Sequence, residues 1–79
     1  MVEVSDLNLQ EYTRHTVRRY LQNLKGHKAK NLNKLFTYEV EKGLILEVLS
    51  FTQGNFTETS EILGITRTTL RNKIRKHNL

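Results

Sequence analysis

The 79-residue chain has no cysteine, no proline and no tryptophan, and its apolar residues never form long runs. Without cysteine the chain can form neither disulfides nor thiolate metal sites. Its three histidines lie far apart, with no carboxylate at ligand spacing, so we expect no metal and no cofactor. No stretch approaches the roughly 20 apolar residues of a membrane span, and the start MVEVSDLNLQEY lacks the features of a signal peptide. The sequence therefore predicts a soluble, cytoplasmic protein with no membrane contact.

Signals of enzymatic chemistry are missing as well. The sequence offers no pair of carboxylates suited to a cleft, no nucleophile beside a plausible base and no phosphate-binding loop. Ser5, Ser50 and Ser60 fit a helix cap, a helix interior and a packing position instead. We therefore predict that the protein is not an enzyme and takes no small-molecule substrate.

Strand patterns are scarce, because the β-branched residues are scattered and nothing alternates with a period of two. The long segments have helical periodicity instead, which predicts an all-α fold in a single domain over 1–79. We expect helices at about 6–24, 32–52, 56–63 and 67–77. A chain this small buries only about 60% of its unfolded surface. A partner chain is therefore the expected stabiliser once disulfides and metals are excluded.

The expected helix ends follow from polar caps and glycines. Residues whose side chains can bond to free N–H groups at the helix starts are Ser5 or Asp6, Asn31, Asn55 and Thr66. Glycines that can take a left-handed backbone at the helix ends are Gly26, Gly54 (after Gln53) and Gly64. Glu58 lies three residues after Asn55, which is the spacing of a capping box.

The second helix is apolar on more sides than one small chain can cover. Its main stripe, at helical spacing, consists of Leu32, Leu35, Phe36, Val40, Leu44 and Val48. The segment LILEVLSF, residues 44–51, adds apolar residues on nearly every side, and such a helix is buried all round. We predict a homodimer in which the long helices within 6–52 pack together. The alternative is that the third and fourth helices of the same chain cover the extra face. Gly43 in this helix is interpreted as a bend or a close helix crossing, since glycine costs roughly 1 kcal/mol there.

No acidic residue occurs from 62 to 79, where five basic residues carry the whole net charge of +5. Residues 55–77 also have the spacing of a helix-turn-helix, whose second helix enters the DNA major groove. The residues that fit this motif are Ser60 at a close crossing, Gly64 and Ile65 in the turn, and Leu70 and Ile74 facing inward. A DNA-binding unit explains both the charge and this register, whereas a solvated basic helix explains only the charge. A membrane-surface helix is disfavoured, because the apolar face is too thin.

The fourth helix has a side suited to a DNA groove when Leu70 and Ile74 are turned inward at about 100° per residue. The residues that then point away are Thr68, Asn72, Arg75 and Lys76, with Arg67 and Arg71 on one flank and Thr69 and Lys73 on the other. A helix in a groove meets base edges in front and phosphates on both sides. The concentrated charge is therefore interpreted as neutralising phosphates.

The chain resembles the Fis family of bacterial nucleoid-associated proteins. The resemblance is strongest in T-x-G-N followed by L-G-I-x-R-x-T-L-R-x-K-(L/I)-x-K, from Thr52 to Lys76, and weaker in NLxKL…EVE at 31–41. It implies a homodimer with intertwined first and second helices, which binds loosely specified AT-containing sites and bends them. Part of the sequence preference would then come from how easily the central minor groove narrows. Nucleoid organisation and transcription regulation are the implied functions.

The resemblance also implies roles for single residues. Arg67 matches an arginine that reaches a guanine edge, and Thr66 matches the adjacent position, usually asparagine. The matches to phosphate-contacting positions are Asn55, Thr57, Thr69, Arg71 and Lys73, and the remaining candidates for DNA contact are Asn72, Arg75 and Lys76. Too few residues precede the first helix for the β-hairpin arm of some Fis proteins, so we expect no recombination enhancement.

Two other functions are compatible with the sequence. One alternative is the DNA-binding output domain of an NtrC-type activator, which ends in the same helices. The other is a helical interaction module whose basic end binds an acidic protein.

Between Tyr12 and Tyr38 there are seven basic residues and no acid. These form either a solvated face and loop or, at Lys25, Lys28 and Lys30, contacts with flanking DNA.

Overall fold

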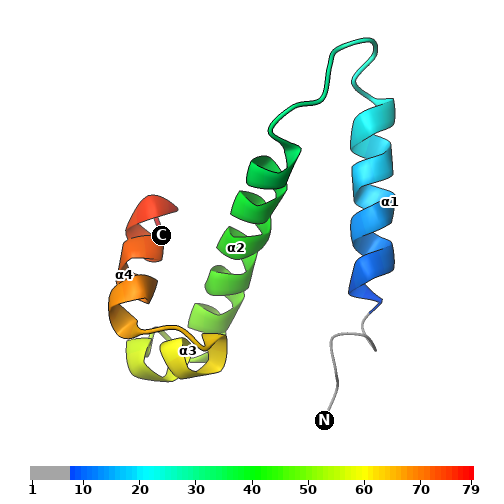
Figure 1. Cartoon of the computed structure of the whole chain (residues 1–79). Helices are drawn as coiled ribbons and strands as arrows, with labels where there is room; N and C mark the ends of the chain where they lie inside the picture. The colour runs from blue at the N-terminus through cyan, green and yellow to red at the C-terminus, as the bar shows by residue number, and fades with distance from the viewer. Residues whose placement is uncertain (1–7) are drawn as a thin grey trace. The chain divides into compact units, whose positions relative to one another are not determined.

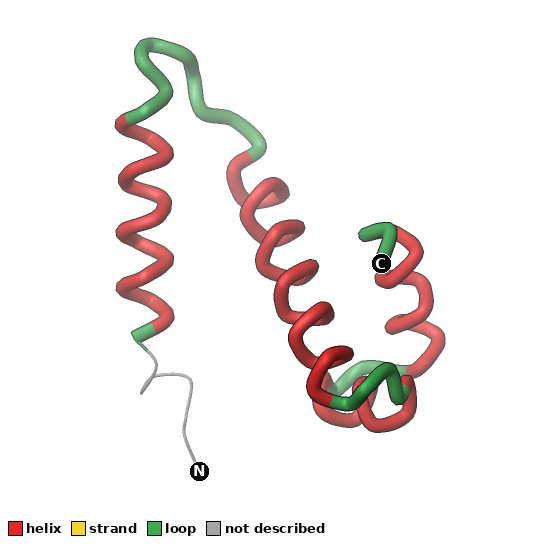
Figure 2. Tube along the Cα trace, turned by 180° about the vertical axis from the view of Figure 1, so that it is seen from behind, coloured by secondary structure: helices red, strands yellow, loops and turns green. Residues whose placement is uncertain are grey.

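The computed structural model describes residues 8–79, which form four α-helices and no strand (Figures 1 and 2). The helices are α1 (Leu9–Gln22), α2 (Leu32–Phe51), α3 (Phe56–Leu63) and α4 (Arg67–Lys76). The predicted all-α fold is therefore confirmed. The chain divides into two compact units, one up to Asn31 and one from Leu32 to Leu79. A single domain over 1–79 stays a prediction.

The first unit contains α1, which is shorter than the range 6–24 expected for it. Asn8 precedes the helix with a left-handed backbone, φ 52°, and makes no side-chain cap bond. The predicted caps Ser5 and Asp6 lie outside the described residues. Gly26 has the expected positive φ, 91°, but it does not cap the helix as predicted. The helix ends earlier because Asn23 is already its C-cap residue, with its N–H bonded to the Arg19 carbonyl.

The second unit begins with α2, which has the predicted length to within one residue. Asn31 precedes it with φ 57° rather than the extended backbone of a typical N-cap residue. At the other end, Gln53 and Gly54 take left-handed conformations. The Gly54 N–H donates to the Leu49 carbonyl at 2.9 Å, which satisfies one of the free carbonyls at the end of the helix. The end predicted at Gln53-Gly54 is confirmed.

The core of this unit lies where α3 and α4 pack against one side of α2. Ile45 of α2 and Leu70 of α4 are its fully buried apolar side chains. The side of α2 that faces inward carries, at spacings of three and four, Tyr38, Glu41, Ile45, Val48 and Thr52. This is not the stripe predicted from hydrophobicity, because three of these five positions carry polar atoms. A polar side chain can occupy this side because α4 supplies partners for it, as described below.

Much of the predicted apolar stripe remains on the surface instead. Five large apolar side chains of α2 are between 44% and 75% exposed: Leu35, Val40, Leu44, Leu46 and Phe51. Thus α3 and α4 do not cover them. The alternative, in which the same chain's third and fourth helices cover the extra face of residues 44–51, holds for Ile45 but not for Leu44, Leu46 and Phe51. A Cβ added to Gly43 would meet no atom within 4 Å. Within the described residues, Gly43 therefore does not mark the close helix crossing that we considered.

Candidate nucleic-acid interface

The interface predicted over 55–77 begins with a well-formed cap on α3. Asn55 has an extended backbone, and its Oδ1 accepts a hydrogen bond from the Glu58 N–H at 3.0 Å. Of the two hydrogen bonds of the expected capping box, only the one to the Asn55 side chain is present. The Asn55 N–H donates to the Thr52 carbonyl at 3.2 Å, so this donor is already used by the preceding turn. Glu58 is exposed, and its backbone serves the cap.

The turn between α3 and α4 has the geometry expected from its glycine. Gly64 adopts φ 74°, and its N–H and that of Ile65 donate to the Ser60 carbonyl at 2.9 and 3.0 Å. Ser60 is 5% exposed, as expected for a small residue at a close crossing. The Thr66 hydroxyl then caps α4 by accepting from the Thr69 N–H at 3.1 Å, and it donates to the Thr69 hydroxyl at 2.9 Å. The direction in which α4 leaves the turn is therefore determined by these short-range hydrogen bonds.

A buried pair of threonines joins this unit to α2. The Thr52 and Thr59 hydroxyl oxygens lie 2.6 Å apart, and Thr59 is completely buried. Neither residue was predicted to take part in packing or binding. The sequence gives only a weak indication of this hydrogen bond, because threonine is common at helix ends and the two residues are seven positions apart. The bond holds the end of α2 against α3 and thus orients the whole helix-turn-helix.

The outward side of α4 carries a row of arginines. Arg67, Arg71 and Arg75 recur every four residues, so they lie along one side of the helix, and all three are exposed. None of them forms an ion pair within residues 8–79. Leu70 is buried and Ile74 half-buried, as predicted. We call these three residues the arginine row.

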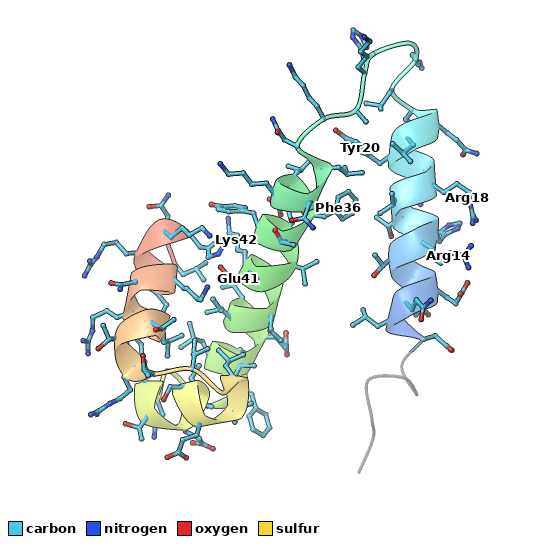
Figure 3. The ribbon with its side chains drawn as sticks, viewed as in Figure 1. Arg14, Arg18, Tyr20, Phe36, Glu41 and Lys42 are labelled. Carbon is cyan, nitrogen blue, oxygen red and sulfur yellow. The ribbon has the colours of Figure 1, made fainter. Side chains whose placement is uncertain are left out.

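The two lysines of α4 behave differently. The Lys73 Nζ lies 2.7 Å from Oε2 of Glu41 on α2, and the Lys76 Nζ lies 3.7 Å from Oε1 of the same carboxylate. Lys76 also lies over the Tyr38 ring, 5.7 Å from its centroid. Lys73 was predicted, with Thr69, on a flank of α4 that contacts phosphates. Its ammonium group instead points back to α2, where Glu41 faces α4 (Figure 3).

His77 completes this cluster, and the sequence analysis missed it. Its ring is 1% exposed, its Nε2 lies 2.8 Å from Oε1 of Glu41, and its centroid lies 4.3 Å from that of Tyr38. A signal did exist, because His77 follows Leu70 by seven residues and Ile74 by three, and so lies on the same inward stripe. The hydrogen bond that Glu41 accepts from Lys73, with the one that it accepts from His77 and the charges of the lysines, lowers the pKa of Glu41 from 4.5 to about 2.

The remaining predicted contact residues are accessible. Asn55, Thr57, Thr66 and Asn72 are exposed, and Thr69 is half-buried. The Thr66 and Thr69 hydroxyls are already bonded to each other. The structure thus brings Thr66, Arg67 and Thr69 together in the first turn of α4. Asn55 and Thr57 lie separately, at the start of α3.

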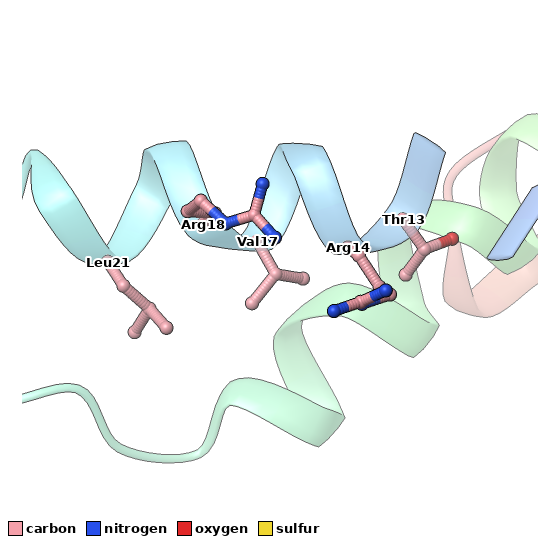
Figure 4. Close-up of a pocket in the computed structure, with 5 residues that line it drawn as sticks. All are labelled: Thr13, Arg14, Val17, Arg18 and Leu21. Carbon is pink, nitrogen blue, oxygen red and sulfur yellow. The ribbon is translucent and has the colours of Figure 1, made fainter. Parts of the chain in front are cut away.

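The second basic region lies mainly in the first unit. Lys25, Lys28 and Lys30 are exposed in the segment between α1 and α2. On α1, Arg14 pairs with Glu11 at 3.3 Å, and Arg14 and Arg18 project from the helix (Figure 3). A shallow surface depression there is lined by Thr13, Arg14, Val17, Arg18 and Leu21 (Figure 4). The exposure of Lys25, Lys28 and Lys30 fits both a solvated loop and contacts with flanking DNA, so the latter stay a prediction.

Comparisons with known proteins point the same way as the geometry. The model of the family described as "Bacterial regulatory protein, Fis family" matches residues 38–77. DNA-binding protein Fis of Glaesserella parasuis is 38% identical over 74 residues, which cover 94% of this chain and 76% of that protein. The Fis protein of Buchnera aphidicola is 37% identical over 69 residues, or 87% and 70%. That of Pasteurella multocida is 34% identical over 77 residues, or 98% and 78%. No helix in residues 8–79 is long and apolar enough to cross a membrane.

Proposed function

Because the chain belongs to the Fis family of bacterial regulatory proteins, we propose that it binds double-stranded DNA with α4 in the major groove. The observation that carries this proposal is the arginine row, which is exposed and without ion pairs within the described residues. The row directly follows the glycine turn at Gly64 that sets the angle between α3 and α4. Basic side chains along a helix that enters a groove are suited to phosphates on its flanks and base edges at its start.

Individual roles follow from position along α4. Arg67 is the first residue of the helix, where side chains come nearest to base edges, and its guanidinium can bond to O6 and N7 of guanine at once. Arg71 and Arg75, further along, are placed for phosphates. The side chains of Asn55, Thr57, Thr69 and Asn72 would add neutral hydrogen bonds to the backbone of the DNA. Thr66 serves first as the cap of α4, so we assign its hydroxyl no separate contact with a base.

We further propose that two copies associate through α2. Val40, Leu44 and Phe51 recur at spacings of four and seven, so they lie along one side of the helix, and all are more than half exposed. Large exposed apolar patches of this kind mark interfaces. A dimer would present two copies of α4 to one duplex. Residues within 6–52 would then act as the dimerisation part and residues 55–77 as the DNA-binding part.

The biological role that we propose is that of a nucleoid-associated regulator in the bacterial cytoplasm, which organises DNA and regulates transcription. Two recognition helices on one dimer would bend a site whose centre is easily deformed. Sequence preference would then depend on an AT-rich centre as well as on the bases that Arg67 contacts.

The test is fluorescence anisotropy with a labelled duplex of roughly 27 base pairs, which is long enough for two major grooves and flanking phosphates. Duplexes with AT-rich and GC-rich centres would be compared at two salt concentrations. We expect tight binding of one dimer, a preference for the AT-rich centre, and a loss of at least about tenfold in affinity for Arg67→Ala. The charge-matched control is Lys34→Ala, an exposed lysine of α2 outside the helix-turn-helix. Absence of binding, or equal effects of the two variants, would contradict the proposal.

A further inference from the structure

Basic residues on α4 that look equivalent in sequence have different surroundings. The three arginines of the arginine row extend into solvent, whereas both lysines lie within 4 Å of the Glu41 carboxylate. We propose that Glu41 holds Lys73, and to a lesser extent Lys76, away from DNA phosphates, so that Arg71 and Arg75 alone carry phosphate neutralisation on α4. This inference rests on the proposed DNA binding and makes Glu41 a determinant of how strongly and how selectively the protein binds.

The ion pair of Lys73 is sheltered enough to persist. The side chains of Lys73 and Glu41 are 29% and 27% exposed, and their atoms are 2.7 Å apart, which is the distance of a charge-assisted hydrogen bond. Lys76 is 57% exposed and its nitrogen is 3.7 Å away, so it is held more loosely. For Lys73 to reach a phosphate, it would have to leave a carboxylate that solvent only partly screens. The arginines have no such bond to break.

The carboxylate itself cannot follow Lys73 outward. Its Oε1 lies 2.8 Å from Nε2 of His77, a ring that is almost completely buried against Tyr38. Glu41 therefore bonds on one oxygen to a fixed ring and on the other to Lys73. Its lowered pKa keeps it ionised in neutral and mildly acidic solution. At neutral pH the negative charge of Glu41 on α2 therefore lies beside Lys73 and His77 at the end of α4.

This arrangement favours selectivity over general attraction to DNA. Binding without sequence preference grows with each phosphate that a basic residue neutralises, whereas base contacts add only at the right site. If Glu41 offsets the charge of Lys73, the protein makes fewer phosphate contacts on every sequence. The contribution of Arg67 and of DNA deformability then forms a larger share of the binding free energy. Glu41 thus reduces non-specific binding more than it reduces specific binding.

The test is the dependence of the association constant on salt concentration, measured by anisotropy on the AT-centred duplex. Each phosphate contact contributes about 0.9 to the slope of log affinity against log salt. The slope is negative, and the variants are compared by its magnitude. We expect Arg71→Met to lower this magnitude by about 0.9 for each subunit that engages the duplex. For one subunit, a fourfold rise in salt would then weaken binding by a factor roughly 3.5-fold smaller than for the wild type. Lys73→Met should change the slope by less than half as much. Glu41→Gln should raise it, because the freed lysine can now reach a phosphate.

The controls separate this inference from the proposed function. If the wild-type protein does not bind the duplex, the proposed DNA binding fails. If it binds and Lys73→Met lowers the slope as much as Arg71→Met does, Lys73 contacts a phosphate and the inference is wrong. An unchanged or smaller slope for Glu41→Gln also contradicts it. Circular dichroism checks that each variant is folded. Lys73→Met leaves the bond between Glu41 and His77 in place, so it decides the question even if Glu41→Gln unfolds.

Discussion

Oε1 of Glu41 lies 2.8 Å from Nε2 of His77, which joins α2 to the end of α4 across 36 positions of sequence. The His77 ring is almost fully buried and stacks at a tilt of 47° on Tyr38. Its Nδ1 is buried with no hydrogen-bond partner among the described residues. The ring therefore stabilises the unit by packing and by one strong bond, while one of its polar atoms remains unsatisfied.

Removal of this ring should destabilise the second unit strongly. We expect His77→Ala to lower the free energy of unfolding by about 2–3 kcal/mol, because the change leaves a cavity and removes a partner of Glu41. Urea denaturation followed by circular dichroism measures this. Arg71→Ala, at an exposed position inside α4, should change stability by no more than about 0.5 kcal/mol. Equal effects of the two substitutions would show that the buried contact does not stabilise α4.

Stability should fall in acid through Glu41. Its pKa is lowered from 4.5 to about 2, first by the hydrogen bond from Lys73 and then by that from His77. A lowered folded-state pKa stabilises the protein above the unfolded-state value, and this stabilisation is lost as the pH falls from about 4.5 toward 2. Because the side chain is partly exposed, we expect a loss on the order of 1–2 kcal/mol.

The comparison of wild type with Glu41→Gln isolates this effect. The stability difference between them should be largest near pH 6 and should shrink as the pH falls below 4.5. Urea midpoints between pH 2 and pH 6 provide the measurement. Glu61→Gln is the control, since this exposed glutamate of α3 makes no ion pair within residues 8–79. A constant offset for Glu41→Gln across this pH range would contradict the assignment.

The bond between Thr52 and Thr59 predicts non-additive substitutions. Thr52→Val removes one hydroxyl and leaves that of Thr59 buried without its partner, so we expect a cost of about 1–2 kcal/mol. The double variant Thr52→Val/Thr59→Val should cost less than the sum of the single variants, because no unpaired hydroxyl remains. Denaturant unfolding of the four proteins completes the cycle. Strict additivity would mean that the 2.6 Å contact contributes nothing.

Two glycines should respond to alanine in opposite directions. Gly64 has φ 74°, so Gly64→Ala should destabilise the turn by about 1–2 kcal/mol through backbone strain alone, as no atom lies within 4 Å of the added Cβ. Gly43 lies inside a helix with equally open surroundings, so Gly43→Ala should stabilise by up to about 1 kcal/mol. Thermal unfolding of both variants tests this. Destabilisation by Gly43→Ala would instead indicate that a second chain crosses α2 there.

Association through α2 is tested by a charge on its exposed apolar side. Leu44→Glu should convert the proposed dimer into monomers at micromolar concentration, because a carboxylate would be buried in an apolar contact. Sedimentation velocity gives the molecular mass directly. Asn78→Glu adds the same charge at an exposed position and should leave the mass unchanged. A monomeric wild type, or a Leu44→Glu protein that remains dimeric, would exclude this interface.

Several elements could be predicted closely because their causes are local. The range 56–63 of α3 agrees with the prediction, and Asn55, Gly64 and Thr66 have the conformations expected of them. Each of these residues acts within four positions of its own, where the chain has few alternatives. The start of α1 was predicted less well. Its expected cap was Ser5 or Asp6, whereas the residue before the helix is Asn8, which makes no side-chain cap bond.

The inward side of α2 could not be predicted from hydrophobicity. Half of the stripe predicted from hydrophobicity is exposed, at Leu35, Val40 and Leu44, and the inward side includes Glu41 and Thr52. Those polar residues are satisfied by groups from other helices, at Lys73, His77 and Thr59. A pattern along a single helix contains no information on such partners. Hydrophobicity therefore identified several residues that stay exposed on this unit, which the proposed dimer would cover.

The sequence by itself determined the four helices, the glycine turn and the concentration of positive charge in the last 18 residues, since these depend on neighbouring residues and composition. Only the tertiary structure decided which of those charges are free. Arg71 and Lys73 are two positions apart and carry the same charge, but Lys73 lies against a carboxylate 32 positions away and Arg71 does not. The difference arises because packing of α4 on α2 turns one side of α4 toward Glu41 and leaves the arginine row facing solvent.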